Sequence, residues 1–172
     1  MSKSTLYFSD NFFSAGLTQI YDENQQTVGQ LDLKSVFSSS VQILDAEGAI
    51  LTQGKFRIFS SRWAVYDGSK EIGELRRRMT FFKKRFEYDA YGRQRAIIES
   101  EAFSREYRIS GENGECMAEF KRTSGLFQSA SFQLIRYSGK LSDSELIAVV
   151  MGIHMIRKRD SQAAASSNSG GG

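Results

Sequence analysis

The fold is decided by the stretch Leu146-Ile147-Ala148-Val149-Val150-Met151-Gly152-Ile153-His154-Met155-Ile156. On a helical wheel every side of this stretch is apolar, and His154 is its one polar residue. A helix of that kind must be buried, either in lipid or inside a protein. Eleven residues of helix rise only about 16 Å, well short of the ~30 Å hydrocarbon core of a bilayer. We therefore predict a core helix that the rest of the chain encloses.

Sequence signals mark both ends of this helix. Ser142 stands three residues before Glu145, which is the spacing of a capping box. A basic run at 157–159 follows the apolar stretch, where the helix dipole favours cations. Gly152 costs a helix about 1 kcal/mol relative to Ala, which indicates that a strand or a bulky side chain approaches closely there. Residues 161–172, rich in Ser, Ala and Gly, predict a disordered tail.

Length and composition bound the class of protein. The chain has 172 residues, enough for one domain with a real core, which we place at residues 1–160. The net charge of +3 is mild and does not by itself imply nucleic acid, which we do not expect as a partner. The N-terminus has no apolar segment typical of a secretory signal. A single cysteine, Cys116, agrees with the reducing cytoplasm.

Two features recur along the chain about every 22 residues. The first is an acidic or glycine-bearing turn, found at 22–24, 45–48, 67–69, 89–92 and 111–114. The second is a Phe beside Ser, Gln or a basic residue, found at 12–14, 37–38, 59–60, 81–83, 103–104 and 127–128. A fixed period indicates stacked supersecondary units. The Asp-x-x-Gly turns between short alternating segments are typical of β-hairpins.

Twelve strands in meander order fit between these turns. They are predicted near 4–8, 17–21, 27–35, 40–44, 49–57, 62–66, 70–79, 84–88, 94–101, 105–109, 115–122 and 130–137. A dozen antiparallel strands rarely stay flat, and closure removes exposed edges. A closed barrel of that size has room for one helix, about 10–12 Å across. The fold class is therefore mainly β, a closed antiparallel barrel of about twelve strands around the C-terminal helix.

These features together resemble the tubby C-terminal-like superfamily, in its LURP-one-related branch, which also groups with phospholipid scramblases. The strongest matches are Lys55-Phe56-Arg57-Ile58-Phe59-Ser60, Asp45-Ala46-Glu47-Gly48 and the stretch 146–156. The resemblance covers residues 4 to 159 and implies a twelve-stranded barrel around a hydrophobic helix. Tubby proteins bind phosphoinositides through a basic surface pocket, so the resemblance implies that this protein, which its cysteine content places in the cytoplasm, is either free there or peripheral at the membrane. Scramblases carry a Pro-rich leader and a cysteine cluster; this chain has no Pro and one Cys, which argues against scrambling.

The one concentration of charge lies at residues 76–95, with eight basic and two acidic residues. The candidate anion-binding or lipid-binding residues are Arg76, Arg77, Arg78, Lys83, Lys84, Arg85, Arg93 and Arg95. The triplets 76–78 and 83–85 end one strand and begin the next, so both should rim the same end of the barrel. Such a rim suits a phosphate-bearing lipid headgroup or another anion. It equally suits a solvated rim that only keeps a barrel soluble.

Arg77 conflicts with the alternation of its strand. It shares parity with Leu75 and Met79, so a regular strand turns all three the same way. Either Gly73 marks a bulge that resets the register, or Arg77 extends along the barrel mouth. We expect an inward-leaning stem with the guanidinium near the rim.

No residues indicate catalysis. His154, the single histidine, is expected to be a core residue hydrogen-bonded to a strand or a water, and Cys116 to be packing. One His and one Cys do not form a usual zinc site, so neither a metal nor a cofactor is expected. We predict a non-catalytic monomer that binds anionic phospholipid headgroups or a membrane surface through the 76–95 rim. The alternative is a protein-interaction or structural module.

Overall fold

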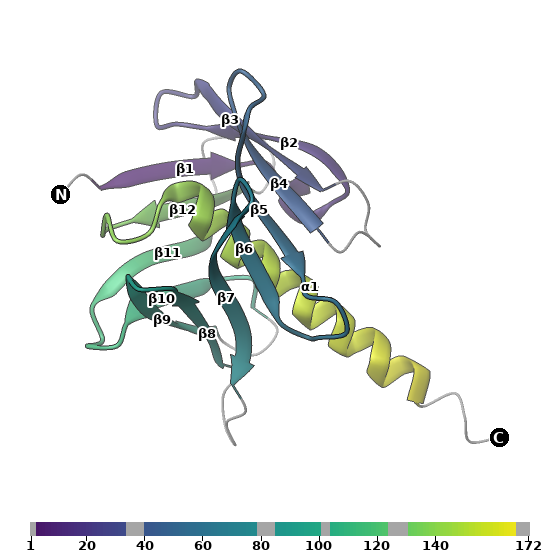
Figure 1. Ribbon diagram of the computed structural model, residues 1–172. Coiled ribbons are helices and arrows are strands. Elements are labelled where there is room, and N and C mark those ends of the chain that lie inside the picture. The colour runs from purple at the N-terminus through teal and green to yellow at the C-terminus, as the bar shows by residue number, and fades with distance from the viewer. Residues whose placement is uncertain (1–2, 34–39, 79–84, 101–103, 124–130, 168–172) are drawn as a thin grey trace.

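A computed structural model describes residues 3–33, 40–78, 85–100, 104–123 and 131–167 of the chain (Figure 1). Its strands are β1 (Ser4–Phe8), β2 (Gly16–Tyr21), β3 (Thr27–Leu33), β4 (Ser40–Asp45), β5 (Ile50–Phe56), β6 (Trp63–Asp67), β7 (Lys70–Arg78), β8 (Arg85–Ala90), β9 (Gln94–Glu99), β10 (Tyr107–Gly111), β11 (Cys116–Thr123) and β12 (Ser131–Arg136). Each strand pairs antiparallel with its neighbours in the chain, and β1 pairs with both β2 and β12, which closes the barrel. The predicted twelve-stranded barrel is confirmed.

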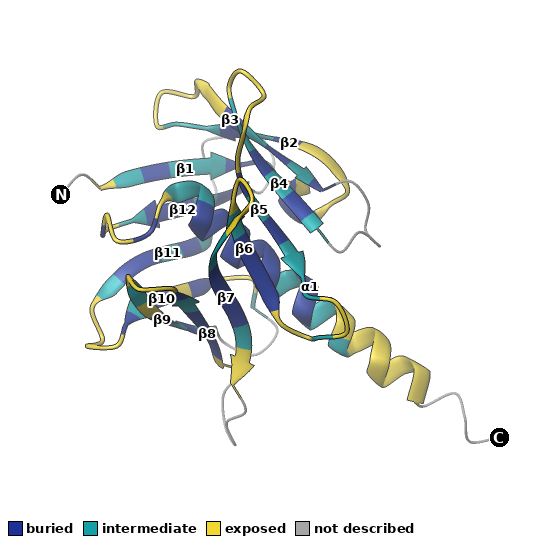
Figure 2. Ribbon diagram, viewed as in Figure 1, coloured by how far each residue is buried: buried dark blue, intermediate teal, exposed yellow. Residues whose placement is uncertain are grey.

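The helix α1 (Asp143–Ser167) runs through the barrel (Figure 1). The whole stretch from Glu145 to Ile156 is buried apart from His154, and Figure 2 shows it in dark blue inside the strands. A short 3-10 helix, η1 (Asp10–Phe13), adds the buried rings of Phe12 and Phe13 to an aromatic cluster with Phe120 and Phe132. The predicted core helix is therefore confirmed.

Gly152 allows the helix and the barrel wall to touch. A Cβ at this position would lie 2.5 Å from Cδ1 of Trp63 and 2.8 Å from Cδ2 of Leu75. The Trp63 indole is fully buried, and its Nε1 donates a hydrogen bond to the Ala148 carbonyl at 3.1 Å. The close neighbour that the sequence predicts at Gly152 is thus a tryptophan.

The two ends of the barrel differ, and we name them by the direction of α1. At the N-terminal mouth, where α1 begins, lie the five hairpin turns of β2–β3, β4–β5, β6–β7, β8–β9 and β10–β11. Asp22 and Asp45 shape their turns, since each Oδ1 accepts two backbone N–H groups at 2.7 to 3.0 Å. At the C-terminal mouth, where α1 leaves, Arg157 bonds the Ser104 carbonyl and Arg159 the Ser60 carbonyl.

The ends of α1 differ from the sequence prediction. Ser142 Oγ accepts the Glu145 N–H at 3.2 Å, as a cap should, but the Glu145 carboxylate turns into the barrel and does not complete a capping box. At the other end the helix continues through residues 161–167, where the sequence predicts disorder. These residues are exposed, and their alanines extend a helix that is already nucleated. Residues 168–172 lie outside the described residues.

Candidate functional site

The predicted basic cluster is divided between both ends of the barrel. Arg76, Arg77, Arg78 and Arg85 lie toward the C-terminal mouth, as expected for the end of β7 and the start of β8. Arg93 lies in the β8–β9 turn at the N-terminal mouth, and Arg95 follows it on β9. Lys83 and Lys84 fall outside the described residues. The structure therefore does not bring Arg93 and Arg95 to the predicted rim.

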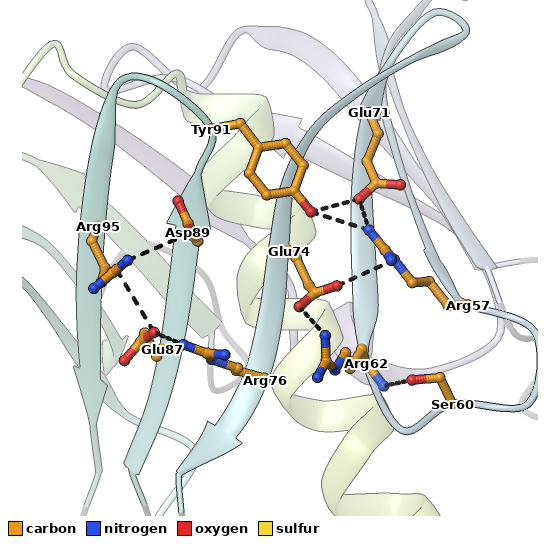
Figure 3. A network of polar contacts seen from close by, with 10 residues as sticks. All are labelled: Arg57, Ser60, Arg62, Glu71, Glu74, Arg76, Glu87, Asp89, Tyr91 and Arg95. Carbon is orange, nitrogen blue, oxygen red and sulfur yellow. Dashed lines mark hydrogen bonds and ion pairs between the residues drawn. The ribbon is translucent and has the colours of Figure 1, made fainter.

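Glu87, on the outer face of the barrel, holds two of the predicted arginines. Arg76 Nη2 lies 2.5 Å from one carboxylate oxygen, and Arg95 Nε is 3.8 Å from the same oxygen (Figure 3). Arg78 Nε lies 2.6 Å from the other oxygen. The carboxylate is covered from solvent by these side chains. Burial raises the pKa of Glu87, but the hydrogen bonds from Arg76 and Arg78 outweigh it and leave that pKa below its usual value. Arg76 and Arg78 are therefore committed to a buried anion of the protein itself.

A second outer network neutralises the arginines of the β5–β6 loop (Figure 3). Arg57 bonds the Glu71 carboxylate, and its Nε lies 3.2 Å from Glu74. Arg62 Nη1 lies 3.1 Å from the same Glu74, and Tyr91 donates to Glu71 at 2.7 Å. Burial raises the pKa of Glu71, but the hydrogen bonds from Tyr91 and Arg57 bring it below its usual value.

Arg93 has a structural role at the N-terminal mouth. Its guanidinium makes two hydrogen bonds to Glu145, at 2.9 and 2.6 Å, and one to the Ile72 carbonyl at 3.1 Å. Glu145 is 1% exposed and also accepts the Tyr88 hydroxyl at 2.6 Å. Burial and the neighbouring Glu145 carboxylate both raise the pKa of Tyr88. Arg93 thus compensates a buried carboxylate on α1.

Arg77 lies where its parity predicts. It pairs in register with the buried Phe86, and its Nη1 lies 2.5 Å from Asp160 on the emerging helix. The β6–β7 pairing shifts register at Ile72, before Gly73, so no bulge separates Leu75 from Arg77. The inward-leaning stem at the mouth is confirmed. The Arg77–Asp160 and Arg85–Glu99 pairs are solvent-exposed, and such pairs contribute little to stability.

A pocket that the sequence does not reveal opens at the C-terminal mouth. Its volume is about 600 Å³, and its wall is formed by Ser104, Arg105, Tyr107, His154, Arg157, Lys158, Asp160, Ser161 and Ala164. Arg157 is held there by neutral oxygens, with the Ser104 carbonyl at 2.7 Å, the Tyr107 hydroxyl at 3.1 Å and Ser100 Oγ at 3.1 Å. Arg105 lies over the Phe13 ring at 5.2 Å.

The pKa of His154 reflects both its burial and the positive charges around this pocket. It is partly exposed in the pocket wall, rather than a core residue, and its ring lies 4.6 Å from that of Phe13. Burial, together with the charges of Arg105, Lys158 and Arg157, lowers the pKa of His154 to about 4. The imidazole is therefore neutral at pH 7. The field that opposes its protonation also attracts an anion.

We expect His154 to make stability depend on pH. Its pKa in the folded chain, about 4, lies below the unfolded value of about 6.5, so the unfolded state binds the proton more tightly. Stability is then full above pH 6.5 and falls by about 2 kcal/mol between pH 7 and pH 5 through this group. Urea unfolding of the wild type and of His154→Gln at both pH values checks this. An equal pH dependence in the two proteins would contradict it.

Comparison with known proteins places this chain in the tubby-like superfamily. The sequence model of the LURP-one-related family, part of that superfamily, matches residues 4–154. The chain therefore belongs to the LURP-one-related family, as its sequence indicates. The X-ray structure of a protein from Arabidopsis thaliana is similar over 88% of each chain, with a TM-score of 0.59 and 14% identity, which shows the same fold. No curated protein matches the chain.

Two other features are absent from the part of the chain that the structure describes, a membrane-spanning helix and a cluster of metal-binding side chains. None of the helices there is long and apolar enough to cross a bilayer. In the same part of the chain, no group of three or more His, Cys, Asp or Glu side chains is arranged to hold a metal ion. The family is generally non-enzymatic.

Proposed function

We propose that this chain is a non-catalytic, monomeric barrel that binds anionic phospholipid headgroups at a cytoplasmic membrane surface through its C-terminal mouth. The observation that carries the proposal is the pocket in which Arg105, Arg157 and Lys158 surround a neutral His154. Arg157 uses neutral oxygens as partners, so its charge is available to an incoming phosphate. Guanidinium groups in a fixed position bind phosphate through charge-assisted hydrogen bonds.

The surroundings of the pocket support a membrane as the source of the phosphate. Arg77 and Arg85, from the predicted rim, lie at the same mouth in exposed ion pairs that a lipid phosphate would disturb at little cost. The opposite mouth carries acidic turn residues, including Asp22, Asp45 and Glu112. Because of this separation of charge, an anionic surface attracts the C-terminal mouth and orients the protein with that mouth toward it.

Cosedimentation with vesicles tests the proposal. The wild type is expected to bind phosphatidylcholine vesicles that contain an anionic lipid, and to lose that binding as salt rises. Arg105→Glu/Lys158→Glu should weaken binding by at least about tenfold, because each cation near the surface contributes about 1 kcal/mol. Lys70→Glu/Lys140→Glu makes the same change of charge at the N-terminal mouth and should have little effect.

Two results would contradict the proposal. One is equal binding to neutral and anionic vesicles, and the other is binding that survives Arg105→Glu/Lys158→Glu. The variant Lys83→Glu/Lys84→Glu tests the remaining lysines of the predicted rim in the same assay. Loss of binding in this variant alone would move the site from the pocket to the rim.

A further inference from the structure

The tip of the loop between β5 and β6 presents two large apolar side chains to solvent. Ile58 is 85% exposed and Phe59 is fully exposed, whereas the next most exposed large apolar residue described, Leu17, reaches 58%. Adjacent exposed apolar side chains of this size mark a contact with a partner or a membrane.

The backbone at Phe59 is held in an unfavourable conformation. Its φ is +55°, in the left-handed region that bulky side chains rarely adopt. Four of the hairpin turns meet the need for a positive φ with glycine, as at Gly48 and Gly68, and the β2–β3 turn meets it with the polar Gln25. Glycine at position 59 would relieve the strain, yet the chain places a phenylalanine there. Such strain is typical of functional sites.

The rest of the chain fixes this tip in place. Within the loop, Arg57 N–H donates to the Arg62 carbonyl at 3.0 Å, and Ser60 N–H donates to the Arg57 carbonyl at 3.2 Å. Arg159 on α1 donates from Nη1 to the Ser60 carbonyl at 3.0 Å. The loop is therefore tied to the helix where the helix leaves the barrel, and Figure 1 shows the two side by side.

The tip lies at the C-terminal mouth, as does the pocket that Arg105, Arg157 and Lys158 line. Arg159 directly follows Arg157 and Lys158, which line the pocket, and its guanidinium stacks 3.9 Å above the Phe56 ring at the base of the loop. An apolar tip with cations at its base matches a bilayer, which offers hydrocarbon below a layer of anionic headgroups.

From these observations we propose that Ile58 and Phe59 insert into the apolar layer of an anionic bilayer. The inference rests on the proposed function and deepens it. The pocket supplies electrostatic contact with headgroups, and the tip adds apolar burial that salt does not screen. Charge complementarity selects a bilayer over an apolar groove on another protein, because Arg159 stands beside the tip and Lys158 lines the pocket at the same mouth.

The first test removes the apolar groups without harming the fold. Ile58→Ser/Phe59→Gly should bind anionic vesicles at least about tenfold more weakly, since each side chain loses its burial. Its melting temperature should stay equal or rise, because glycine accepts the positive φ at position 59. Ile50→Ser/Leu51→Ser alters two exposed apolar residues at the opposite end of β5, and should leave binding unchanged.

The second test locates the tip. Phe59→Trp places an indole at the tip, while the native Trp63 is fully buried and serves as the internal reference. With anionic vesicles, acyl chains that carry bromine should quench the added indole and spare the wild-type emission. An added indole that stays accessible to iodide in the vesicle-bound protein would overturn the proposal, and would leave a protein partner as the occupant of the tip.

The two proposals fail in different ways. If vesicle binding survives Ile58→Ser/Phe59→Gly but not Arg105→Glu/Lys158→Glu, insertion is overturned and headgroup binding stands. If the wild type binds no anionic vesicle, headgroup binding is overturned, and insertion falls with it.

Discussion

Met151→Asp is expected to unfold the protein or to lower its free energy of unfolding by more than about 4 kcal/mol. Met151 is fully buried at the centre of α1, inside the closed wall of strands. An aspartate there would lie within the cluster of buried apolar side chains, so it must either take up a proton or leave the core. A domain of this size has about 5–15 kcal/mol of stability, so the loss is a large part of the total.

Urea unfolding followed by circular dichroism measures this effect against two controls. Met151→Leu conserves volume and apolarity, and should cost less than about 1.5 kcal/mol. Ala163→Asp adds the same charge to the exposed end of the same helix, and should change stability by less than about 0.5 kcal/mol. If Met151→Asp melts at the wild-type temperature, the helix is not the core of the barrel.

The sequence predicts the fold well because two independent patterns agree. The stretch 146–156 requires enclosure, and turns about every 22 residues supply the strands that enclose it. Bounds are less exact: the strand predicted at 105–109 is observed at Tyr107–Gly111. The β10–β11 pairing shifts register beside the turn, between Ile109 and Ser110. Such a shift changes which residues of the two strands face each other, and the alternation of apolar and polar residues does not predict it. Three other hairpins carry such a shift, after Ile20, Ile43 and Val65.

The candidate site is harder to predict, because closeness in sequence is not closeness in a barrel. The strand β8 (Arg85–Ala90) carries the chain from one mouth to the other, so it separates Arg93 from Arg85. The pocket shows the converse, since Arg105 and Arg157 are more than fifty positions apart and meet only because α1 returns through the barrel. The sequence also does not identify Glu87 as the partner of Arg76, because that pairing depends on the register of β7 and β8.

Arg93 allows an experimental test of the difference between closeness in sequence and closeness in the barrel. It belongs to the basic cluster in sequence, yet in the structure it pairs with Glu145, which is 1% exposed. We expect Arg93→Met to lower the free energy of unfolding by about 3 kcal/mol or more, because it leaves a buried carboxylate without its cation. Binding to anionic vesicles by the folded fraction should not change.

Two companion variants separate the loss of the pair from the loss of a surface charge. Arg95→Met removes an arginine whose acidic contacts are 3.5 Å or longer, and should change stability by less than about 1 kcal/mol. Arg93→Met/Glu145→Gln removes both charges and keeps an acceptor for the Tyr88 hydroxyl, so it should recover most of the lost stability. If the double variant is no more stable than Arg93→Met, the cost does not come from the unpaired Glu145 carboxylate. If Arg93→Met keeps wild-type stability but loses vesicle binding, Arg93 is a ligand residue after all, and the N-terminal mouth is the membrane-facing end.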